Sequence, residues 1–362
     1  MHDLSLLTTE AVDLLTSLIA TPSISRQESA AADIVEHFLA SRGLSPRREA
    51  NNVWVMAPAY DATRPTLLLC AHIDTVKPVA AWTRNPFEPT IEGDCLYGLG
   101  ANDDGASLVT LIQTFRVLSA KPQAYNLILV CSAEEEISGS EGFARVKPLL
   151  PHIDVALVGE PTAMQPAIAE RGLMVLDCTA HGRAGHAARD EGVNAIYVAM
   201  KDIEWARTYQ FDRVSDLLGP VKMTTTIINA GTQHNVVPDT CTFTVDVRSN
   251  ELYTNEEIFN KVCASIKSDV VARSFRLGSS GIGNNHPLVK SALSLGPLPD
   301  GRPRTPFGSP TLSDQCLMPW PSLKMGPGNS ARSHTADEFI LISELRQAIQ
   351  EYTTMLDGLR LA

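Results

Sequence analysis

Short apolar runs that lead into acidic residues or histidine are the feature that most constrains the fold of this chain. The runs Thr66–Ala71, Asn126–Cys131 and Val155–Val158 are almost entirely apolar and too short for ordinary helices. Such runs are typical of strands that are buried on both faces of a sheet. A segment of helical character, Ser107–Leu118, lies between the first two of them. This alternation predicts an α/β sheet covered by helices on both faces.

The middle of the chain has a different pattern from its ends. In the end regions, helices are predicted over Leu4–Ala40, with a break at Thr21–Pro22, and over Ile342–Leu359. After Arg171 the predicted elements are the strands Leu173–Ala180, Met223–Ile228 and Thr240–Val247 and the helices Asn194–Thr208 and Asn255–Ser268. We therefore expect a small α+β domain at residues 172–281, inserted into one domain formed by residues 1–171 and 282–362.

Charge and cysteine usage exclude some classes of function. The chain has 30 basic and 41 acidic residues and a formal net charge of -11, which argues against a nucleic-acid partner because such proteins need a basic face. Its 7 cysteines are scattered without a CxxC pair, as is typical of reduced thiols. The N-terminal residues lack a secretory pattern, and no apolar run approaches the length of a membrane span. We expect a cytoplasmic protein with no membrane partner.

Polar residues follow the predicted strands at the positions where functional groups of open α/β sheets gather. His72 and Asp74 follow the first apolar run, Glu134–Glu136 follow the second, and Glu160 follows the third. Taken singly, each has an ordinary explanation: a buried structural histidine, a charged turn or a turn acid. Three adjacent acids at the end of a buried strand also repel one another, and a divalent cation would relieve that repulsion.

Two further candidates lie in loops. Asp103 and Asp104 occupy a glycine-rich turn, where adjacent acids usually mean a solvated loop or a helix cap, and His334 lies in a polar loop near the C-terminus. Considered together, two histidines and three carboxylates form the ligand set expected for two zinc ions. A carboxylate shared by both ions fits a two-metal site, and an additional glutamate that binds no metal can act as a general base.

With these motifs in place, the sequence resembles the aminoacylase-like di-zinc metallopeptidases of the M20 family, especially the branch of acetylornithine deacetylase and succinyl-diaminopimelate desuccinylase. The resemblance runs from about residue 67 to residue 339 and rests on the combination of HIDTV, WTRNPF, YGLGANDD, AEEE, VGEPT, HGRAGHAA, NVVPD, DVR and GPGNSARSHTADEF. It implies a zinc-exopeptidase-like catalytic domain with a mixed sheet covered by helices. It also implies that the inserted domain is a ferredoxin-like dimerisation domain.

The resemblance implies a role for each metal-site residue. Position by position, His72 and Glu160 would bind one Zn²⁺, His334 and Glu136 the other, and Asp103 would bridge both; Co²⁺ is the expected substitute metal.

The same resemblance assigns residues that support the reaction. Asp74 would support His72, and Glu135 would be the general base. Because three acids are adjacent, Glu134–Glu135 could instead be the base and ligand pair; we favour Glu135–Glu136 because Glu134 stands where relatives often have Asp.

Substrate contacts are implied mainly for the inserted segment. His186 matches a histidine that such enzymes lend to the neighbouring active site of a homodimer. Asn235 and Arg248 match positions that hold the substrate carboxylate, which the guanidinium fork suits. Arg171 also matches a substrate-side motif, although a surface salt bridge is the alternative for either arginine. The chain departs from its relatives at Leu99, where Arg is common, and at Asp104–Gly105, where Met-Lys is common.

The implied activity is metal-dependent hydrolysis of the amide bond of a small N-acyl amino acid. The expected substrate is N-acetyl-L-ornithine or N-succinyl-L-ornithine, which would release ornithine in arginine biosynthesis; the same residues would also serve an N-acylated citrulline, lysine or diaminopimelate. A carboxypeptidase or dipeptidase of the same family is the first alternative, because it would use the same residues. A binding protein that keeps the fold without catalysis is a more distant alternative.

Overall fold

The computed structural model describes residues 3–58 and 60–361. The chain divides into two compact units. Unit 1 comprises Met1–Ile168, Gly281–Phe307 and Ser313–Ala362, and unit 2 comprises Ala169–Ser280 and Gly308–Leu312. The chain therefore leaves the first unit near residue 168 and returns near residue 281, and it leaves again only for the short segment Gly308–Leu312.

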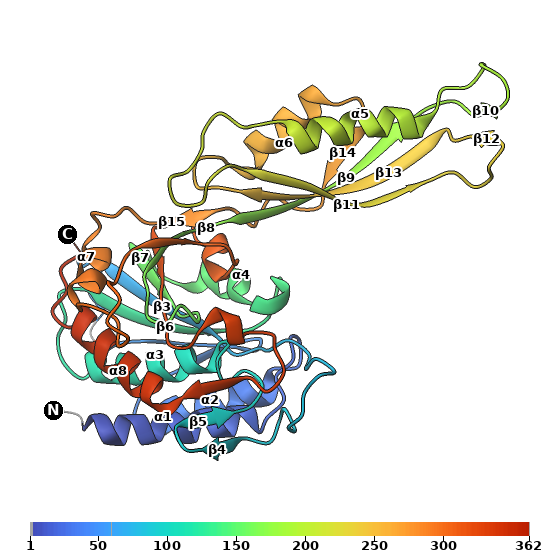
Figure 1. Ribbon diagram of the computed structural model, residues 1–362. Coiled ribbons are helices and arrows are strands. Elements are labelled where there is room, and N and C mark those ends of the chain that lie inside the picture. The colour runs from blue at the N-terminus through green and yellow to red at the C-terminus, as the bar shows by residue number, and fades with distance from the viewer. Residues whose placement is uncertain (1–2, 59, 362) are drawn as a thin grey trace. The chain divides into compact units, whose positions relative to one another are not determined.

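A mixed sheet has the strand order β1-β2-β6-β3-β7-β17-β8-β15, with β16 paired to β8; its strands from β1 to β17 in this order belong to unit 1, while β8, β15 and β16 include residues assigned to unit 2 (Figure 1). The strands are β1 (Arg47–Glu49), β2 (Asn52–Met56), β3 (Thr66–His72), β6 (Asn126–Ser132), β7 (Val155–Val158), β8 (Ala167–Glu170), β15 (Ser280–Gly281), β16 (Phe307–Ser309) and β17 (Ser322–Lys324). Strands β6, β3, β7 and β17 run parallel, while β2 and β8 pair antiparallel with their neighbours β6 and β17.

Helices cover this sheet and bury its apolar side chains. Helix α3 packs against β3 and β6, and α1 and α8 pack beside it (Figure 1). The helices of unit 1 are α1 (Leu4–Ile19), α2 (Ser29–Ser41), α3 (Gly105–Ser119), α4 (Phe143–Val146), α7 (Pro287–Ser294) and α8 (Ile342–Leu356). All residues of β3 and β6 are buried, as a sheet covered on both faces requires.

Short elements complete unit 1. A small antiparallel sheet has the order β18-β5-β4, and its strands are β4 (Thr90–Glu92), β5 (Cys95–Tyr97) and β18 (Phe339–Leu341). Single turns of 3₁₀ helix are η1 (Glu135–Ile137), η2 (Lys147–Leu149), η3 (Asp314–Leu317) and η4 (Ser330–Arg332). Two of them, η1 and η4, directly precede or contain candidate site residues.

Unit 2 has the element order β-α-β-β-α-β and a four-stranded antiparallel sheet with the order β11-β13-β9-β14, which is the ferredoxin-like arrangement. Its elements are β9 (Gly172–His181), α5 (Ala195–Thr208), β11 (Lys222–Ala230), β13 (Thr240–Ser249), α6 (Asn255–Ser265) and β14 (Asp269–Ala272), with a short sheet of β10 (Gly185–His186) and β12 (Val236–Val237). Alternate residues of β9 and β13 are buried beneath α5 and α6 (Figure 1).

The predicted fold class, an α/β protein with a mixed sheet covered by helices, is confirmed. The sequence did not indicate the antiparallel edge strand β1, the small β18-β5-β4 sheet, or the assignment of Gly308–Leu312 to unit 2. These segments are three to five residues long, too short for a periodicity to be recognised. Helix α6 ends at Ser265 rather than Ser268, because the main-chain N–H groups of residues 267 and 268 bind the buried carboxylate of Asp202 instead.

Among the described residues, no helix combines the length and the apolar character that a membrane span requires.

Candidate metal-binding active site

The candidate site forms at the carboxyl ends of three neighbouring parallel strands. His72 ends β3 and pairs with Ser132, the last residue of β6, while Cys70 pairs with Val158, the last residue of β7. The residues that follow these strand ends therefore emerge at one edge of the sheet. Glu160 comes two residues after Val158, and Glu135 comes three residues after Ser132.

The imidazole of His72 is fixed from both ends. Its side chain is 2% exposed, and Nδ1 lies 2.9 Å from the main-chain oxygen of Asp74 and 3.5 Å from that residue's Oδ1. The carbonyl is the closer partner, so the predicted support from Asp74 comes first from its main chain. A proton on Nδ1 leaves Nε2 as the lone-pair nitrogen, which points toward Asp103 at 3.3 Å.

Asp103 faces both candidate histidines. Its Oδ1 lies 3.3 Å from Nε2 of His72, and its Oδ2 lies 3.6 Å from Nε2 of His334. The residue belongs to the loop between β5 and α3, and the peptide bond to Asp104 is cis. One carboxylate with an oxygen toward each imidazole is the arrangement that a bridging ligand between two metal ions needs.

The triple acid turns its members in different directions. Glu134 adopts a left-handed conformation, and its carboxylate accepts from the main-chain N–H of Glu141 and lies 3.7 Å from Arg26. Glu135 instead lies with His72, 3.9 Å from its Nε2, and Glu136 lies 3.1 Å from Nε2 of His334. This geometry favours Glu135–Glu136 over Glu134–Glu135 as the pair at the site.

The carboxylate of Asp74 fixes the Glu135–Glu136 turn. Its Oδ1 accepts from the main-chain N–H of Glu135 at 3.0 Å and its Oδ2 from that of Glu136 at 3.2 Å, while the hydroxyl of Ser25 donates to Oδ2 at 2.7 Å. Asp74 therefore connects the end of β3 with the turn that follows β6.

The side chains could hold metal ions. Ligand atoms of His72, Asp103 and Glu136 lie within 4.8 Å of one another, and so do those of His72, Glu135 and Glu160. Four carboxylates this close repel one another in a partly buried setting, and divalent cations would offset the repulsion. Imidazole nitrogens and carboxylate oxygens are donors that Zn²⁺ accepts. The donor chemistry thus fits metal ions.

Ionisation of the cluster reflects the crowding. Burial raises the pKa of the Glu135 carboxyl well above its ordinary value, and repulsion from Glu160 adds to this effect. Burial alone would lower the pKa of the His72 imidazole, but the contacts with Asp103 and Asp74 raise it well above its usual range. The contact with Glu136 raises the pKa of His334 to about 8.

His334 occupies a tight turn rather than a strand end. It has a φ of 57°, a left-handed conformation that is uncommon for residues other than glycine, and its side chain is 53% exposed. Asp337, three residues later, accepts from the main-chain N–H groups of Thr83 and Arg84 and from the Thr83 hydroxyl. Backbone hydrogen bonds, rather than packing around the imidazole, hold this part of the site.

Two buried residues near the site were not singled out from the sequence, namely Asn102 and Glu338. Both contact the loop that carries Asp103 or the turn that carries His334. The sequence feature that could have identified these two residues is their position beside candidate ligands, in GANDD and in SHTADEF. That signal is weak, because polar residues are common in such loops.

The four candidate residues of unit 2 lie near opposite ends of its sheet. Arg171 precedes β9 and Arg248 lies near the end of β13, where Leu173 pairs with Arg248. His186 lies in β10, and the main-chain oxygen of Asn235 accepts from Ala187, one residue further on. The ten residues of β9 span about 33 Å. The arginines and the His186–Asn235 pair are therefore too far apart to contact one small molecule within unit 2.

Both arginines already have partners. Arg171 donates to the main-chain oxygens of Pro220, at 2.9 Å, and of Leu218. Arg248 donates to both carboxylate oxygens of Asp246, at 2.8 and 3.2 Å. Arg171 thus anchors the loop before β11. Arg248 forms the ion pair that was the alternative to substrate binding.

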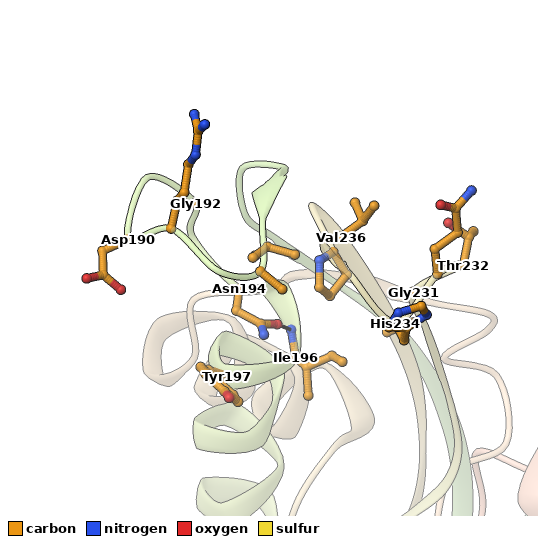
Figure 2. A pocket seen from close by; sticks show the side chains of 15 residues that line it. Asp190, Gly192, Asn194, Ile196, Tyr197, Gly231, Thr232, His234 and Val236 are labelled. Atoms are coloured by element: carbon orange, nitrogen blue, oxygen red, sulfur yellow. Dashed lines mark hydrogen bonds between the residues drawn. The ribbon is translucent and has the colours of Figure 1, made fainter.

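A large hollow of about 800 Å³ lies at the His186 end of unit 2. Figure 2 shows it between the loop with Asp190 and the first turn of α5 on one side and the loop with Thr232 and His234 on the other. It contains none of the clustered donors of unit 1. We therefore place the candidate site at the donor cluster of unit 1 and not at this hollow, because a hollow without clustered donor side chains is no evidence of a metal site.

Comparison with known proteins defines the class that this fold and donor set belong to. Residues 68–358 match the model of peptidase family M20/M25/M40, so the chain belongs to that family of hydrolases. It is 26% identical to acetylornithine deacetylase from Proteus mirabilis (strain HI4320), over 91% of each chain. It is 24% identical to succinyl-diaminopimelate desuccinylase from Xanthomonas oryzae pv. oryzae (strain PXO99A), over 97% of this chain and 99% of that one.

Solved structures share the fold. A tripeptidase from Staphylococcus aureus subsp. aureus Mu50 has a TM-score of 0.74 at 20% identity and covers 96% of this chain and 97% of its own. An M20 family metallo-carboxypeptidase from Sulfolobus solfataricus has a TM-score of 0.70 at 18% identity, with coverage of 96% and 99%. The predicted family is confirmed by the match over residues 68–358, and these structures support its fold.

Proposed function

We propose that this protein is a two-metal hydrolase that cleaves the amide bond of an N-acyl amino acid, with N-acetyl-L-ornithine or N-succinyl-L-ornithine as substrate and ornithine as product in arginine biosynthesis. The observation that carries the proposal is the convergence of one glutamate, Glu135, with the donor cluster at the edge of the sheet. The names of the curated relatives support an acyl amino acid as the substrate class. A cytoplasmic location stays a prediction from the sequence.

We assign the metal positions from the family resemblance, and the contacts of Asp103 with both histidines and of Glu136 with His334 support the assignment. One ion would be held by His72 and Glu160, the other by His334 and Glu136, with Asp103 between them. When bound, two Zn²⁺ or Co²⁺ ions would polarise the scissile carbonyl group and lower the pKa of water.

Glu135 would move the proton. It lies beside the imidazole of His72 rather than in a solvent-facing ion pair, and its main chain is held by Asp74. A carboxylate placed there accepts a proton from the attacking water and passes it to the departing amine, so that the C–N bond breaks as the amine leaves neutral. Positioned proton transfer of this kind typically contributes about 10²–10⁴-fold to the rate.

Substrate contacts would come from unit 2 of two copies. Arg248 suits the carboxylate of the amino acid, since its guanidinium can bind a carboxylate through two hydrogen bonds. His186 and Asn235 lie at the opposite end of the unit 2 sheet from Arg248, and the family resemblance implies that His186 serves the site of a second chain, where it would donate to the developing oxyanion. Both arginines already donate to other groups, Arg248 to the Asp246 carboxylate and Arg171 to main-chain carbonyls, so either one would have to exchange a partner in order to bind substrate.

An exposed edge strand supports a homodimer. Strand β11 pairs with β13 on one side only within the described residues, so its other side offers unpaired main-chain groups. A register irregularity between Thr225 and Ile227 leaves both Ile227 and Ile228 51% exposed. On α5, which packs against β11, Tyr197 is 65% exposed. Pairing of two copies along β11 would bury these apolar side chains.

The activity is tested with a substrate panel. The protein is loaded with Zn²⁺ or Co²⁺ and offered N-acetyl-L-ornithine, N-succinyl-L-ornithine and matched dipeptides, and kcat/KM is measured for each. We expect an acylated ornithine to be the best substrate. A higher kcat/KM for a dipeptide would make the protein a peptidase. If the protein neither turns over any of these substrates nor takes up metal, only the binding-protein alternative remains.

The shared site is tested with mixed dimers. His186→Ala and Glu135→Gln chains are each inactive as homodimers, but after unfolding and refolding together they should recover about a quarter of wild-type activity, since half of the dimers are hybrids with one complete site. Absence of recovery, with hybrids demonstrated by mass, would contradict the exchange of His186 between chains.

A further inference from the structure

A buried carboxylate joins the two loops that carry Asp103 and His334. Glu338 is 2% exposed, and its Oε1 accepts from the main-chain N–H groups of Asn102 at 2.8 Å and Asp103 at 2.9 Å, while its Oε2 accepts from Gly100 at 3.2 Å. Its main-chain oxygen accepts from Gly98 at 3.0 Å. One residue therefore binds four N–H groups of the segment 98–103, which we call the Asp103 loop.

A second buried side chain makes the return connection. Asn102 is fully buried; its Oδ1 accepts from the main-chain N–H of Asn329 at 2.9 Å, and its Nδ2 lies 3.2 Å from the main-chain oxygen of Asn329 and from the hydroxyl of Ser333. Ser333 immediately precedes His334. The segment 329–338, which we call the His334 turn, is thus tied to the Asp103 loop at both of its ends.

The close approach of the two segments leaves no space for a side chain at Gly328. This residue has a φ of +77°, and a Cβ atom there would collide with Oδ1 of Asn102. The contact between Asn102 and the start of the His334 turn is consequently direct, with no intervening group.

We propose that Glu338 is a positioning residue that holds Asp103 and His334 at the spacing required by the metal ion between His334 and Glu136. The inference rests on the proposed two-metal function. It deepens that function because Glu338, which is not a metal ligand, would determine how tightly this ion binds. Exposure makes such a residue necessary, because the His334 imidazole is 53% exposed and little packing restrains it. The His72 position has other support, since β3 and Asp74 hold its imidazole.

The chemistry calls for a carboxylate rather than an amide. Three N–H donors converge on the two oxygens of Glu338, so both oxygens act as acceptors. In Glu338→Gln, one oxygen becomes an NH₂ group that faces N–H donors. At least one main-chain N–H then loses its acceptor, which loosens the Asp103 loop while the side-chain volume is kept.

The test is a metal titration of the full-length protein. Metal-free wild type and Glu338→Gln are titrated with Co²⁺, followed by visible absorption, and with Zn²⁺, followed by calorimetry. We expect the weaker of the two binding steps to become about 10–100-fold weaker in Glu338→Gln. The tighter step should weaken less, because the His72 position shares only Asp103 and keeps its own support from β3 and Asp74.

Two comparisons separate positioning from general damage. Glu351→Gln makes the same chemical change at an ion pair with Arg304 elsewhere in unit 1, and it should leave both steps unchanged. In a His334→Ala background, where the affected position is already lost, Glu338→Gln should have an effect below about threefold on the remaining ion. If Glu338→Gln does not fold, Asn102→Ala interrupts the other connection and should weaken the same step.

The outcomes distinguish two kinds of failure. Wild type that binds no divalent ion overturns the two-metal proposal, and the role of Glu338 falls with it. Wild type that binds two ions, together with a folded Glu338→Gln that binds both equally well, overturns only the role of Glu338. Equal weakening of both steps also contradicts it.

Discussion

His72 and His334 face different oxygens of the same aspartate, Asp103, and the chain holds them in place by different means. His72 ends a buried central strand, so the pairing of β3 with β6 and β7 fixes its position. His334 lies in a left-handed turn, and hydrogen bonds from neighbouring loops fix that turn. The sheet therefore fixes the His72 side of the cluster, whereas a few polar contacts fix the His334 side. We expect substitutions to disturb the His334 side more easily.

The largest effect should come from the side chain that moves the proton. Glu135→Gln keeps the volume and the main-chain contact with Asp74 but removes the proton acceptor, so kcat should fall by about 10²–10⁴-fold while metal content stays unchanged. Glu134→Gln is the matched control, because its carboxylate faces Arg26 and the main chain of Glu141. A larger loss of kcat in the control would reverse the assignment within the triple acid.

The two histidines themselves provide the direct comparison. His72→Ala should abolish tight metal binding and cost about 0.5–3 kcal/mol of stability, because it removes a buried, hydrogen-bonded side chain. His334→Ala should lose only one of the two ions and leave the free energy of unfolding of the metal-free protein almost unchanged. Metal content by atomic emission and urea unfolding measure both. Equal losses of metal and stability in the two variants would remove the distinction between them.

The Asp74 carboxylate allows the comparison to be sharpened. It holds the main chain of both Glu135, whose side chain lies near His72, and Glu136, whose side chain contacts His334. Asp74→Asn replaces one acceptor oxygen with a donor, so metal affinity or activity should fall by about 10–100-fold. Ser25→Ala removes only the hydroxyl that donates to this carboxylate and should have a smaller effect. Wild-type affinity and turnover in Asp74→Asn would show that the turn is held without it.

The smallest expected effect concerns thermal stability. Ligands that bind only the folded state stabilise it, by about 2.7 kcal/mol when the ion is at one hundred times its Kd. A chelator added in steps to the metal-loaded protein should therefore lower Tm in two stages, and the first stage should be missing in His334→Ala. A single stage in wild type would indicate that the two ions leave together.

The sequence predicted those parts of the molecule that follow from strong local patterns. The buried strands β3, β6 and β7 are short apolar runs, and the strand-end rule then brings His72, Glu135 and Glu160 to one edge without knowledge of the fold. The pairing order could not be read in this way, because β17, from residues 322–324, lies between β7 and β8. Such a non-local pairing depends on packing that no local window contains.

Loop geometry was the least predictable part of the site. The direction of Glu134 depends on a left-handed turn and on a contact with Glu141, neither of which is visible in a run of three acids. The roles of Asn102 and Glu338 depend on main-chain N–H groups, which every residue except proline carries. Sequence patterns identify donors for a metal more readily than the residues that hold those donors in place.

The position of β17 bears on how the protein forms during synthesis. Because β17 lies between β7 and β8 in the sheet, the sheet stays divided until the ribosome has added residues 322–324. His334 is synthesised still later, so the nascent chain exposes several acidic metal-ligand candidates before His334 has been added. Unit 2, encoded between these segments, can fold while unit 1 waits. A chain that terminates before residue 322 would thus carry a finished second unit on an open and acidic first one.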